Sequence, residues 1–202
     1  MSGRRRYELK ERARKQAETR LKIVEALVEL HETVGASRAT VGEVAKRAGV
    51  NRMTVYNHFA TEAEMVAACT SHWIERHPPP DMAGWKAIGD PDERLSRALA
   101  DLYAYYRETA AMWTTAYRDA PLVPALGTIM DETWFALLDT TVDVLAAGRG
   151  ARGRARVTLR AALRTAIDFP TWSRLTGSGL GDDEAAAIAS GFVRCASPST
   201  RR

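Results

Sequence analysis

The sequence predicts an all-α protein of about nine helices, and three observations lead to that prediction. Apolar side chains recur at spacings of three and four residues, which is the period of one helix face. Thr, Asn and Asp stand where helices should begin, and some of them have Glu three residues later, as in a capping box. The alternation and hairpin turns that mark β-strands are convincing nowhere in the chain.

The first predicted helix covers about 8–34. Its prediction rests on four apolar residues that share one face: Ile23, Leu27, Leu30 and Val34. Gly35 can end this helix, because glycine readily takes the left-handed backbone conformation that follows many helices.

Two short helices follow, and each has a recognisable start. Thr40 and Glu43 form a capping box and predict a helix over about 40–47. Gly49 ends it, and Asn51 is a good N-cap for a second short helix through Asn57. Because a glycine permits the sharp turn between them, this pair fits a helix-turn-helix.

The remaining helices are predicted from the same signals. Thr61–Glu64 repeats the capping box and starts a helix that reaches about Arg76, where the prolines at 78–80 must end it. Asp90 and Pro91 combine an N-cap with proline in the first helical position. Further helices are expected over about 90–108, 110–117, 121–147, 154–175 (kinked at Pro170) and 182–195, with a glycine-rich loop over 148–153.

Charge is distributed unevenly along the 202 residues. Residues 1–60 carry 13 basic and 7 acidic side chains, whereas residues 61–202 carry 16 and 18. This asymmetry favours a basic module that faces a polyanion, although a solvated basic tail would look the same. Cys69 and Cys195 are too isolated for a disulfide framework or a zinc site, and no apolar run approaches the roughly 18 residues of a membrane span. We therefore expect a cytoplasmic protein without a membrane partner.

The second short helix of the pair carries the candidate DNA-reading face. Val55 and Phe59 lie four residues apart and can pack inward. The outward remainder is polar, cationic and aromatic, and suits insertion into a major groove. Its residues are Arg52, Met53, Thr54, Tyr56, Asn57 and His58.

Residues 40–59, TVGEVAKRAGVNRMTVYNHF, resemble the DNA-binding signature of the TetR family of transcriptional regulators. That signature typically reads T-v-x-x-I-A-x-x-A-G-V-S-x-x-t-l-Y-x-Y/H-F. The resemblance implies a homodimer whose subunits each have a three-helix DNA-binding head and a helical regulatory body. We thus expect a helix-turn-helix domain over 1–60, a connecting helix over 61–77, and a ligand-binding and dimerisation domain over 78–202.

The resemblance also implies roles for individual residues. Thr40 would hold a phosphate with its hydroxyl and the helix-terminal amides. Arg52 and Met53 would reach bases, while Thr54, Tyr56, Asn57 and His58 would contact phosphates and sometimes bases. The sequence departs from the family pattern at Met53, where a small residue is usual, and at Glu62, where a basic residue is common. Charge alone suggests that an N-terminal arm compensates, with Arg4, Arg5, Arg6, Lys10 and Arg14.

The C-terminal body is rich in aromatic residues at helical spacings. Core packing explains most of them, but a helical domain lined with Trp and Tyr also suits a pocket for an apolar or aromatic ligand. The candidate ligand residues are Tyr103, Tyr106, Trp113, Tyr117, Trp134, Leu138, Asp168 and Trp172. In the family the last two helices form the dimer interface, which assigns Leu163, Ile167, Ile188 and Phe192 to it.

The function these features favour is a DNA-binding transcriptional regulator, acting as a repressor on a near-palindromic operator and released by a small effector. One alternative is a DNA-binding dimer that senses nothing. Another is an enzyme that uses the aromatic body, but the sequence has no G-x-S-x-G elbow and no metal-ligand spacing. Residues 148–153 satisfy G-x-G-x-x-G only as a loop that follows a helix, so we expect no enzyme activity, cofactor or metal.

Overall fold

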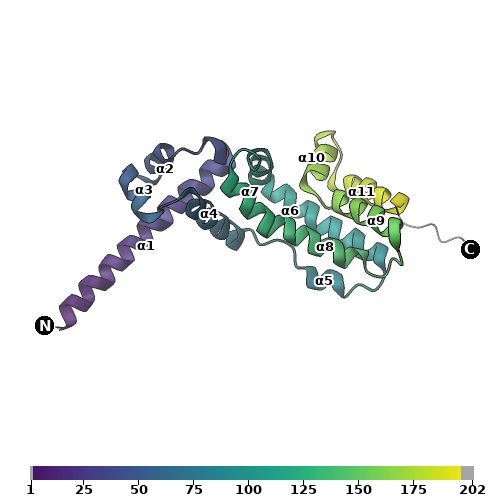
Figure 1. Cartoon of the computed structure of the whole chain (residues 1–202), viewed down its shortest axis with the longest axis horizontal. Coiled ribbons are helices and arrows are strands. Elements are labelled where there is room, and N and C mark those ends of the chain that lie inside the picture. The colour runs from purple at the N-terminus through teal and green to yellow at the C-terminus, as the bar shows by residue number, and fades with distance from the viewer. Residues whose placement is uncertain (1, 197–202) are drawn as a thin grey trace, which may run out of the picture. The chain divides into compact units, whose positions relative to one another are not determined.

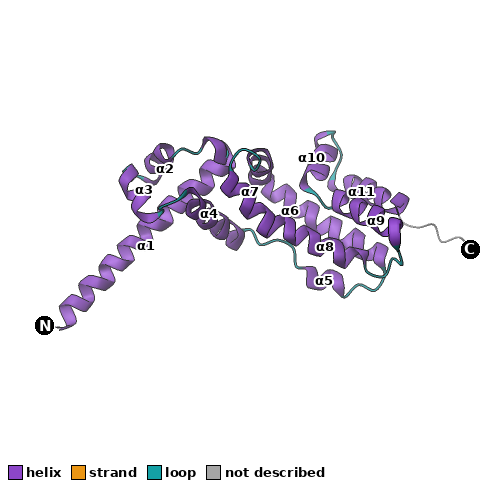
Figure 2. Ribbon diagram, viewed as in Figure 1, coloured by secondary structure: helices purple, strands orange, loops and turns teal. Residues whose placement is uncertain are grey.

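Every regular element in the part of the chain that the computed structural model describes, residues 2–196, is a helix, which confirms the all-α prediction (Figure 2). For residues 2–6 only the backbone is described. The described residues form eleven α-helices, one 3₁₀ turn and one π-helical segment, more elements than the nine expected from the sequence.

The chain divides into two compact units. Figure 1 labels the helices that make them up. The first unit contains the residues up to His77 together with Thr114–Ile129, and the second contains Pro78–Trp113 and the residues from Met130 onward. The prolines at 78–80 therefore lie at the first boundary between the two units along the sequence. The helix α6 (Pro91–Asp119) contributes residues to both units.

The first unit is built on α1 (Ser2–Thr33), against which α2 (Val41–Ala48) and α4 (Glu62–Arg76) pack. The 3₁₀ turn η1 (Ala36–Arg38) precedes α2, and α3 (Arg52–His58) follows it. Buried apolar side chains from these helices form one core. They are Ile23, Val24, Ala26, Leu27, Leu30, Val44, Ala45, Val55, Phe59 and Cys69.

The second unit contains α5, most of α6, and the helices from η2 onward. Within it α9 packs against both α8 and α11, and α10 packs against α11. The remaining elements of the chain are α5 (Met82–Lys86), α7 (Pro124–Met130, in the first unit except for its last residue), the π-helical η2 (Asp131–Phe135), α8 (Ala136–Ala146), α9 (Gly153–Ala166), α10 (Phe169–Gly177) and α11 (Asp182–Ala196).

Four predicted helices differ from the structure, and one observed helix was not predicted. The helices expected over 90–108 and 110–117 are one continuous helix, α6, because no glycine or proline interrupts the sequence between Pro91 and Asp119. The helix expected from Pro121 begins at Pro124 and contains the π-helical segment η2. The short helix α5 was not predicted, although Asp81 caps it by accepting from the Ala83 amide at 2.9 Å.

The helix expected over 154–175 is two helices, and Pro170 lies in the first turn of the second rather than at a kink. The break falls at Ile167 and Asp168. There the hydroxyls of Tyr103 and Tyr106 donate to the carbonyls of Ala166 and Ile167, at 2.8 Å and 2.6 Å. Because these tyrosines satisfy carbonyls at the end of α9, the chain can leave the helix without stranding buried acceptors.

Candidate nucleic-acid interface

The helix α3 divides its side chains among three directions. Val55 and Phe59 are buried in the core of the first unit. Arg52, Asn57 and two large side chains are exposed, with Met53 at 66% and Tyr56 at 53% of full accessibility. The exposed Met and Tyr share one stripe of α3 with Arg52 and Asn57, and this stripe corresponds to the predicted DNA-reading face.

Thr54 and His58 face a different direction from the rest of the predicted face. Both are only partly exposed, and together they line a groove of about 490 Å³ beside α1. The Thr54 hydroxyl donates to Asn51 Oδ1 at 2.9 Å, and the Thr54 amide donates to the same oxygen at 2.7 Å. The hydroxyl proton is therefore occupied within the chain, and the phosphate contact expected of Thr54 stays a prediction.

The groove beside α1 also brings in two basic residues that sequence reasoning missed. Arg12 and Lys15 line it together with Thr54 and His58. A signal for Arg12 was present, because Arg12, Gln16, Thr19 and Ile23 continue one stripe of α1 at helical spacing. Two carboxylates, Glu8 and Glu11, line the same groove.

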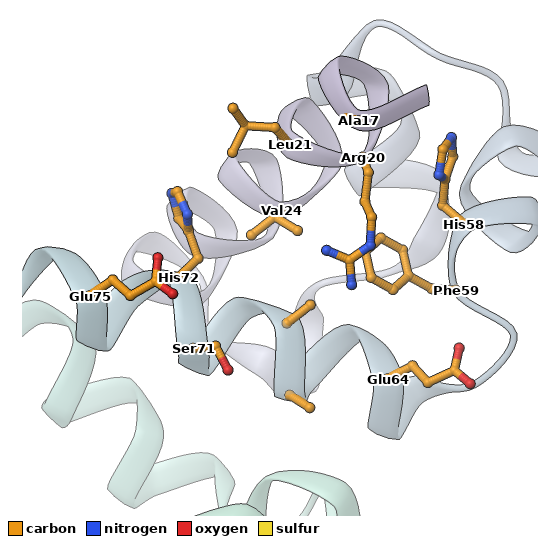
Figure 3. Close-up of a pocket in the computed structure, with 12 residues that line it drawn as sticks. Ala17, Arg20, Leu21, Val24, His58, Phe59, Glu64, Ser71, His72 and Glu75 are labelled. Carbon is orange, nitrogen blue, oxygen red and sulfur yellow. The ribbon is translucent and has the colours of Figure 1, made fainter. Parts of the chain in front are cut away.

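His58 also lies at a second groove, of about 640 Å³, which runs between α1 and α4 (Figure 3). Figure 3 shows Arg20 extending from α1 toward the ring of Phe59, and its guanidinium carbon lies 4.6 Å from the ring centroid. This cation–π contact covers one face of the buried Phe59 ring, which is part of the core of the first unit. The small residues that leave room for the groove are Ala17, Ala67, Ala68 and Ser71.

The turn between α2 and α3 has the geometry that the sequence predicts. Thr40 caps α2 by accepting from the Glu43 amide at 3.2 Å, so its exposed hydroxyl keeps its proton to donate. Gly49 has φ 67°, in the left-handed region where a glycine is strongly favoured, and Val50 donates its amide to the Ala45 carbonyl at 2.9 Å. Asn51 then starts α3 through its bond to the Thr54 amide.

The N-terminal arm is helical throughout its described length. Arg4, Arg5 and Arg6 lie in the first turns of α1, and their side chains lie outside the described part of the structure. Lys10 is exposed. Arg14 forms ion pairs with Glu11 at 2.9 Å and Glu18 at 2.8 Å, so intrahelical carboxylates already compensate its charge. Those two glutamates raise the pKa of Arg14, and Arg14 lowers the pKa of Glu11.

The segment that enters α2 is held by the C-terminal end of α6, within the first unit. The fully buried carboxylate of Asp119 accepts from the Ser37 amide at 3.0 Å and from Arg118 Nε at 2.7 Å. Arg118 also donates to the Val34 carbonyl at 2.8 Å. The adjacent guanidinium and the Ser37 amide hold the pKa of Asp119 below its usual value, despite its burial. The end of α6 thus bonds to Val34 and to Ser37, two residues of the segment that leads into α2.

The aromatic ligand residues predicted in the second unit fall into one cluster. The rings of Trp113 and Trp134 have centroids 4.2 Å apart, and Tyr106 lies 6.0 Å from Trp134 and 5.9 Å from Trp172. Tyr105 and Phe169, which were not predicted, complete the cluster. Burial raises the pKa of Tyr103, whose hydroxyl is engaged by α9.

Three predicted ligand residues have other surroundings. Tyr117 belongs to the first unit, and Leu138 is buried in α8. Asp168 pairs with Arg164 at 3.0 Å. None of the predicted ligand residues lines the groove of about 740 Å³ that runs beside α5 and α6, where Trp85 and Tyr105 lie with Asp81, Asp101 and Glu108. The predicted ligand role of these residues stays a prediction.

The residues assigned to a dimer interface differ in exposure. Leu163 and Ile167 have no accessible surface within a single chain, so they belong to its own core and cannot offer surface to a partner. The error arose because α9 packs on α8 and α11, which covers that side of α9. Ile188 and Phe192 on α11 are 39% and 41% exposed, and these two remain available.

Neither a metal-ligand cluster nor a membrane-crossing helix occurs in the described part of the chain. Among residues 2–196, no group of three or more His, Cys, Asp or Glu side chains is arranged to hold a metal ion. None of the helices that these residues form combines the length and apolar character that crossing a membrane requires.

Known proteins resemble both the first unit and the whole fold. Residues 23–69 match the family described as bacterial regulatory proteins, tetR family. Over 77 residues the chain is 36% identical to the HTH-type transcriptional regulator SrpR of Pseudomonas putida, a match that covers 35% of this chain and 36% of SrpR. The chain thus matches little more than a third of that relative's length.

Solved structures extend the likeness to most of the chain. A transcriptional regulator from Rhodococcus sp. Rha1 has a TM-score of 0.61 and 26% identity, over 86% of this chain and 95% of that one. A protein from Saccharomonospora viridis, solved in complex with choline, has a TM-score of 0.57 at 18% identity, over 88% of this chain and 96% of that one. The second likeness is one of fold.

Proposed function

We propose that the whole chain is a ligand-responsive transcriptional repressor, and the premise is that residues 23–69 match the tetR family of bacterial regulatory proteins. In this proposal residues 1–60 read DNA, residues 61–77 connect, and residues 78–202 bind an effector and form a homodimer. The observation that carries the DNA-binding part is the exposed stripe of α3, in which Arg52, Met53, Tyr56 and Asn57 project while Val55 and Phe59 anchor the helix.

Affinity and specificity would come from different side chains. Phosphate contacts from Thr40, Thr54, His58 and the basic residues of α1 would supply most of the affinity, which must then fall as salt rises. The exposed stripe of α3 would supply base contacts. Two such helices about 34 to 36 Å apart in a homodimer fit successive major grooves, so the operator should be nearly palindromic.

The homodimer would use the exposed apolar surface of α11. Ile188 and Phe192 lie four residues apart, on one face of that helix. Large apolar side chains that remain exposed at this spacing favour packing against a second helix. A closed two-fold arrangement would place the same residues of the second copy against them.

The effector would be small and largely apolar or aromatic. The aromatic cluster of the second unit supports this proposal, and a protein of the same fold that was solved in complex with choline shows that this fold can hold a small molecule. Effector binding would favour a conformation with lower affinity for the operator. By linkage, operator DNA must then weaken effector binding by the same factor.

The direct test is selection of bound DNA from random sequence with the full chain, repeated in the presence of a metabolite library. We expect a near-palindromic consensus that weakens with one class of compound. Arg52→Ala should lose preference at one base pair of each half-site, whereas Arg174→Ala, a control that removes an exposed arginine of α10, should keep the full consensus. Unchanged affinity and base preference for Arg52→Ala would refute the role of Arg52, and a consensus that no compound weakens would favour a dimer without an effector.

A further inference from the structure

Gly42, in the first turn of α2, leaves a space that the side chain of Arg52 fills. A Cβ atom added at Gly42 would lie 2.6 Å from Arg52 Nη2 and 3.1 Å from both Cζ and Nε. Real Cβ atoms essentially never approach another heavy atom within 3.0 Å, so with any other residue at position 42 the guanidinium, the flexible end of an exposed side chain, would have to move. The guanidinium of Arg52 therefore lies directly over Gly42, and we call this position its seat on α2.

The need for glycine at this position is steric and not conformational. Gly42 lies within the helical span of α2, and its φ is not in the left-handed region that favours glycine. Gly49 is the opposite case, because its φ is 67° and a Cβ there would meet nothing within 4 Å. The backbone of α2 therefore does not itself require glycine at position 42, which lies in the first turn of the helix.

Arg52 has little else to fix its direction. It is the first residue of α3, it is exposed, and no hydrogen bond or ion pair of the described residues holds its guanidinium. An arginine in that state samples many rotamers, and ordering it on DNA costs conformational entropy. A seat on α2 reduces this cost, because it restricts the guanidinium before DNA arrives.

We propose that Gly42 is a positioning residue for sequence readout, which acts by seating the guanidinium of Arg52. The inference rests on the proposed function, in which α3 is the recognition helix. Bidentate recognition of a base by arginine depends on a fixed, planar pair of donors, so a displaced guanidinium loses discrimination between bases more than it loses attraction to phosphate. Because it has no side chain, Gly42 of α2 thus leaves room for the Arg52 guanidinium, and in this way it contributes to the specificity of α3.

The test is Gly42→Ala in the full chain. The substitution should raise the thermal midpoint slightly, because alanine favours helix over glycine. At the same time it should reduce discrimination at the base pair read by Arg52 by at least about fivefold, the lower end of what a bidentate contact provides. Discrimination is measured as the ratio of dissociation constants between the selected operator and a panel with each base pair replaced, by fluorescence anisotropy. The base pair itself is located with Arg52→Ala.

Two controls separate a positioning role from a structural one. Gly84→Ala, at an exposed helical glycine of α5 with nothing within 4 Å of an added Cβ, should leave the discrimination ratios unchanged. In an Arg52→Ala background, Gly42→Ala should cause no further change in those ratios, because the group it positions is gone.

Three results would be decisive. Unchanged discrimination in Gly42→Ala would overturn the proposal, as would an equal loss in the Arg52→Ala background, since position 42 would then act without Arg52. Improved discrimination would also overturn it, because the seat would then hold Arg52 away from DNA. Failure of the proposed function is distinct from all three, because the wild-type chain would then select no sequence from random DNA.

Discussion

The buried imidazole of His31 makes the stability of the protein depend on pH in a direction that can be worked out. His31 on α1 and Cys69 on α4 are both buried, and His31 Nδ1 lies 3.3 Å from Cys69 Sγ. Burial lowers the pKa of His31 to about 4 from 6.5, against the weaker opposing effect of Asp119. Burial also raises the pKa of Cys69 to about 12. Both groups are therefore neutral in the folded chain near pH 7.

The sign follows from which state binds more protons. In the unfolded chain His31 takes up a proton as the pH falls through about 6.5, whereas in the folded chain it does so only near pH 4. Between these values the unfolded state binds more protons, so the free energy of unfolding falls as the pH is lowered. The loss attributable to His31 is about 2 kcal/mol at pH 5 and about 3 kcal/mol once the pH is below 4, a large share of a typical domain's stability.

The assay is urea unfolding followed by circular dichroism, at several pH values between 7.5 and 5. Compared with wild type, His31→Gln should lose about 2 kcal/mol less over this range, since all other titrating groups are common to the two proteins. Cys69→Ala should keep the wild-type pH dependence, because the imidazole remains buried without the thiol. Parallel loss of stability in wild type and His31→Gln would refute the reasoning.

Three further predictions follow from buried, apolar and basic groups. Asp119→Ala should lower the free energy of unfolding by about 1–3 kcal/mol, because the Ser37 amide and Arg118 lose their buried acceptor, and an unchanged urea midpoint would contradict this. Phe192→Lys should convert a dimer into a monomer in light scattering, and a variant that stays dimeric would place the interface elsewhere. Replacing Arg4, Arg5 and Arg6 with Gln should reduce the slope of log Kd against log salt by about 0.9 for each phosphate that these arginines neutralise, whereas an unchanged slope would leave their side chains in solvent.

The helix-turn-helix could be predicted closely because its signals are local. The Thr40, Asn51 and Thr61 side chains each cap the helix that begins one residue later, and Gly49 takes the left-handed conformation that its position suggested. Each of these features depends on residues within about four positions in sequence. A pattern of this kind can be recognised without knowing what the rest of the chain does.

The elements that could not be predicted depend on distant residues. The end of α9 is set by bonds from Tyr103 and Tyr106, which are 63 and 61 residues away. The π-helical segment η2 places Trp134 against Trp113, and nothing local to residues 131–135 signals the extra residue in that turn. At α3 the sequence could assign Val55 and Phe59 to the core, but the turning of Thr54 and His58 toward α1 depends on how far α1 extends beside them.

The helix α6 links the aromatic cluster to the segment that enters the helix-turn-helix through one continuous run of backbone. The part of α6 up to Trp113 lies in the second unit and contains Tyr103, Tyr106 and Trp113. The part from Thr114 onward lies in the first unit and contains Asp119 and Thr115, and the Thr115 hydroxyl donates to the His31 carbonyl at 2.7 Å. After Pro91 the helix contains no glycine or proline, the usual sites of a sharp kink. If the proposed effector binds at the aromatic cluster, the helix that it meets is therefore the one whose last residue, Asp119, accepts from the Ser37 amide ahead of α2.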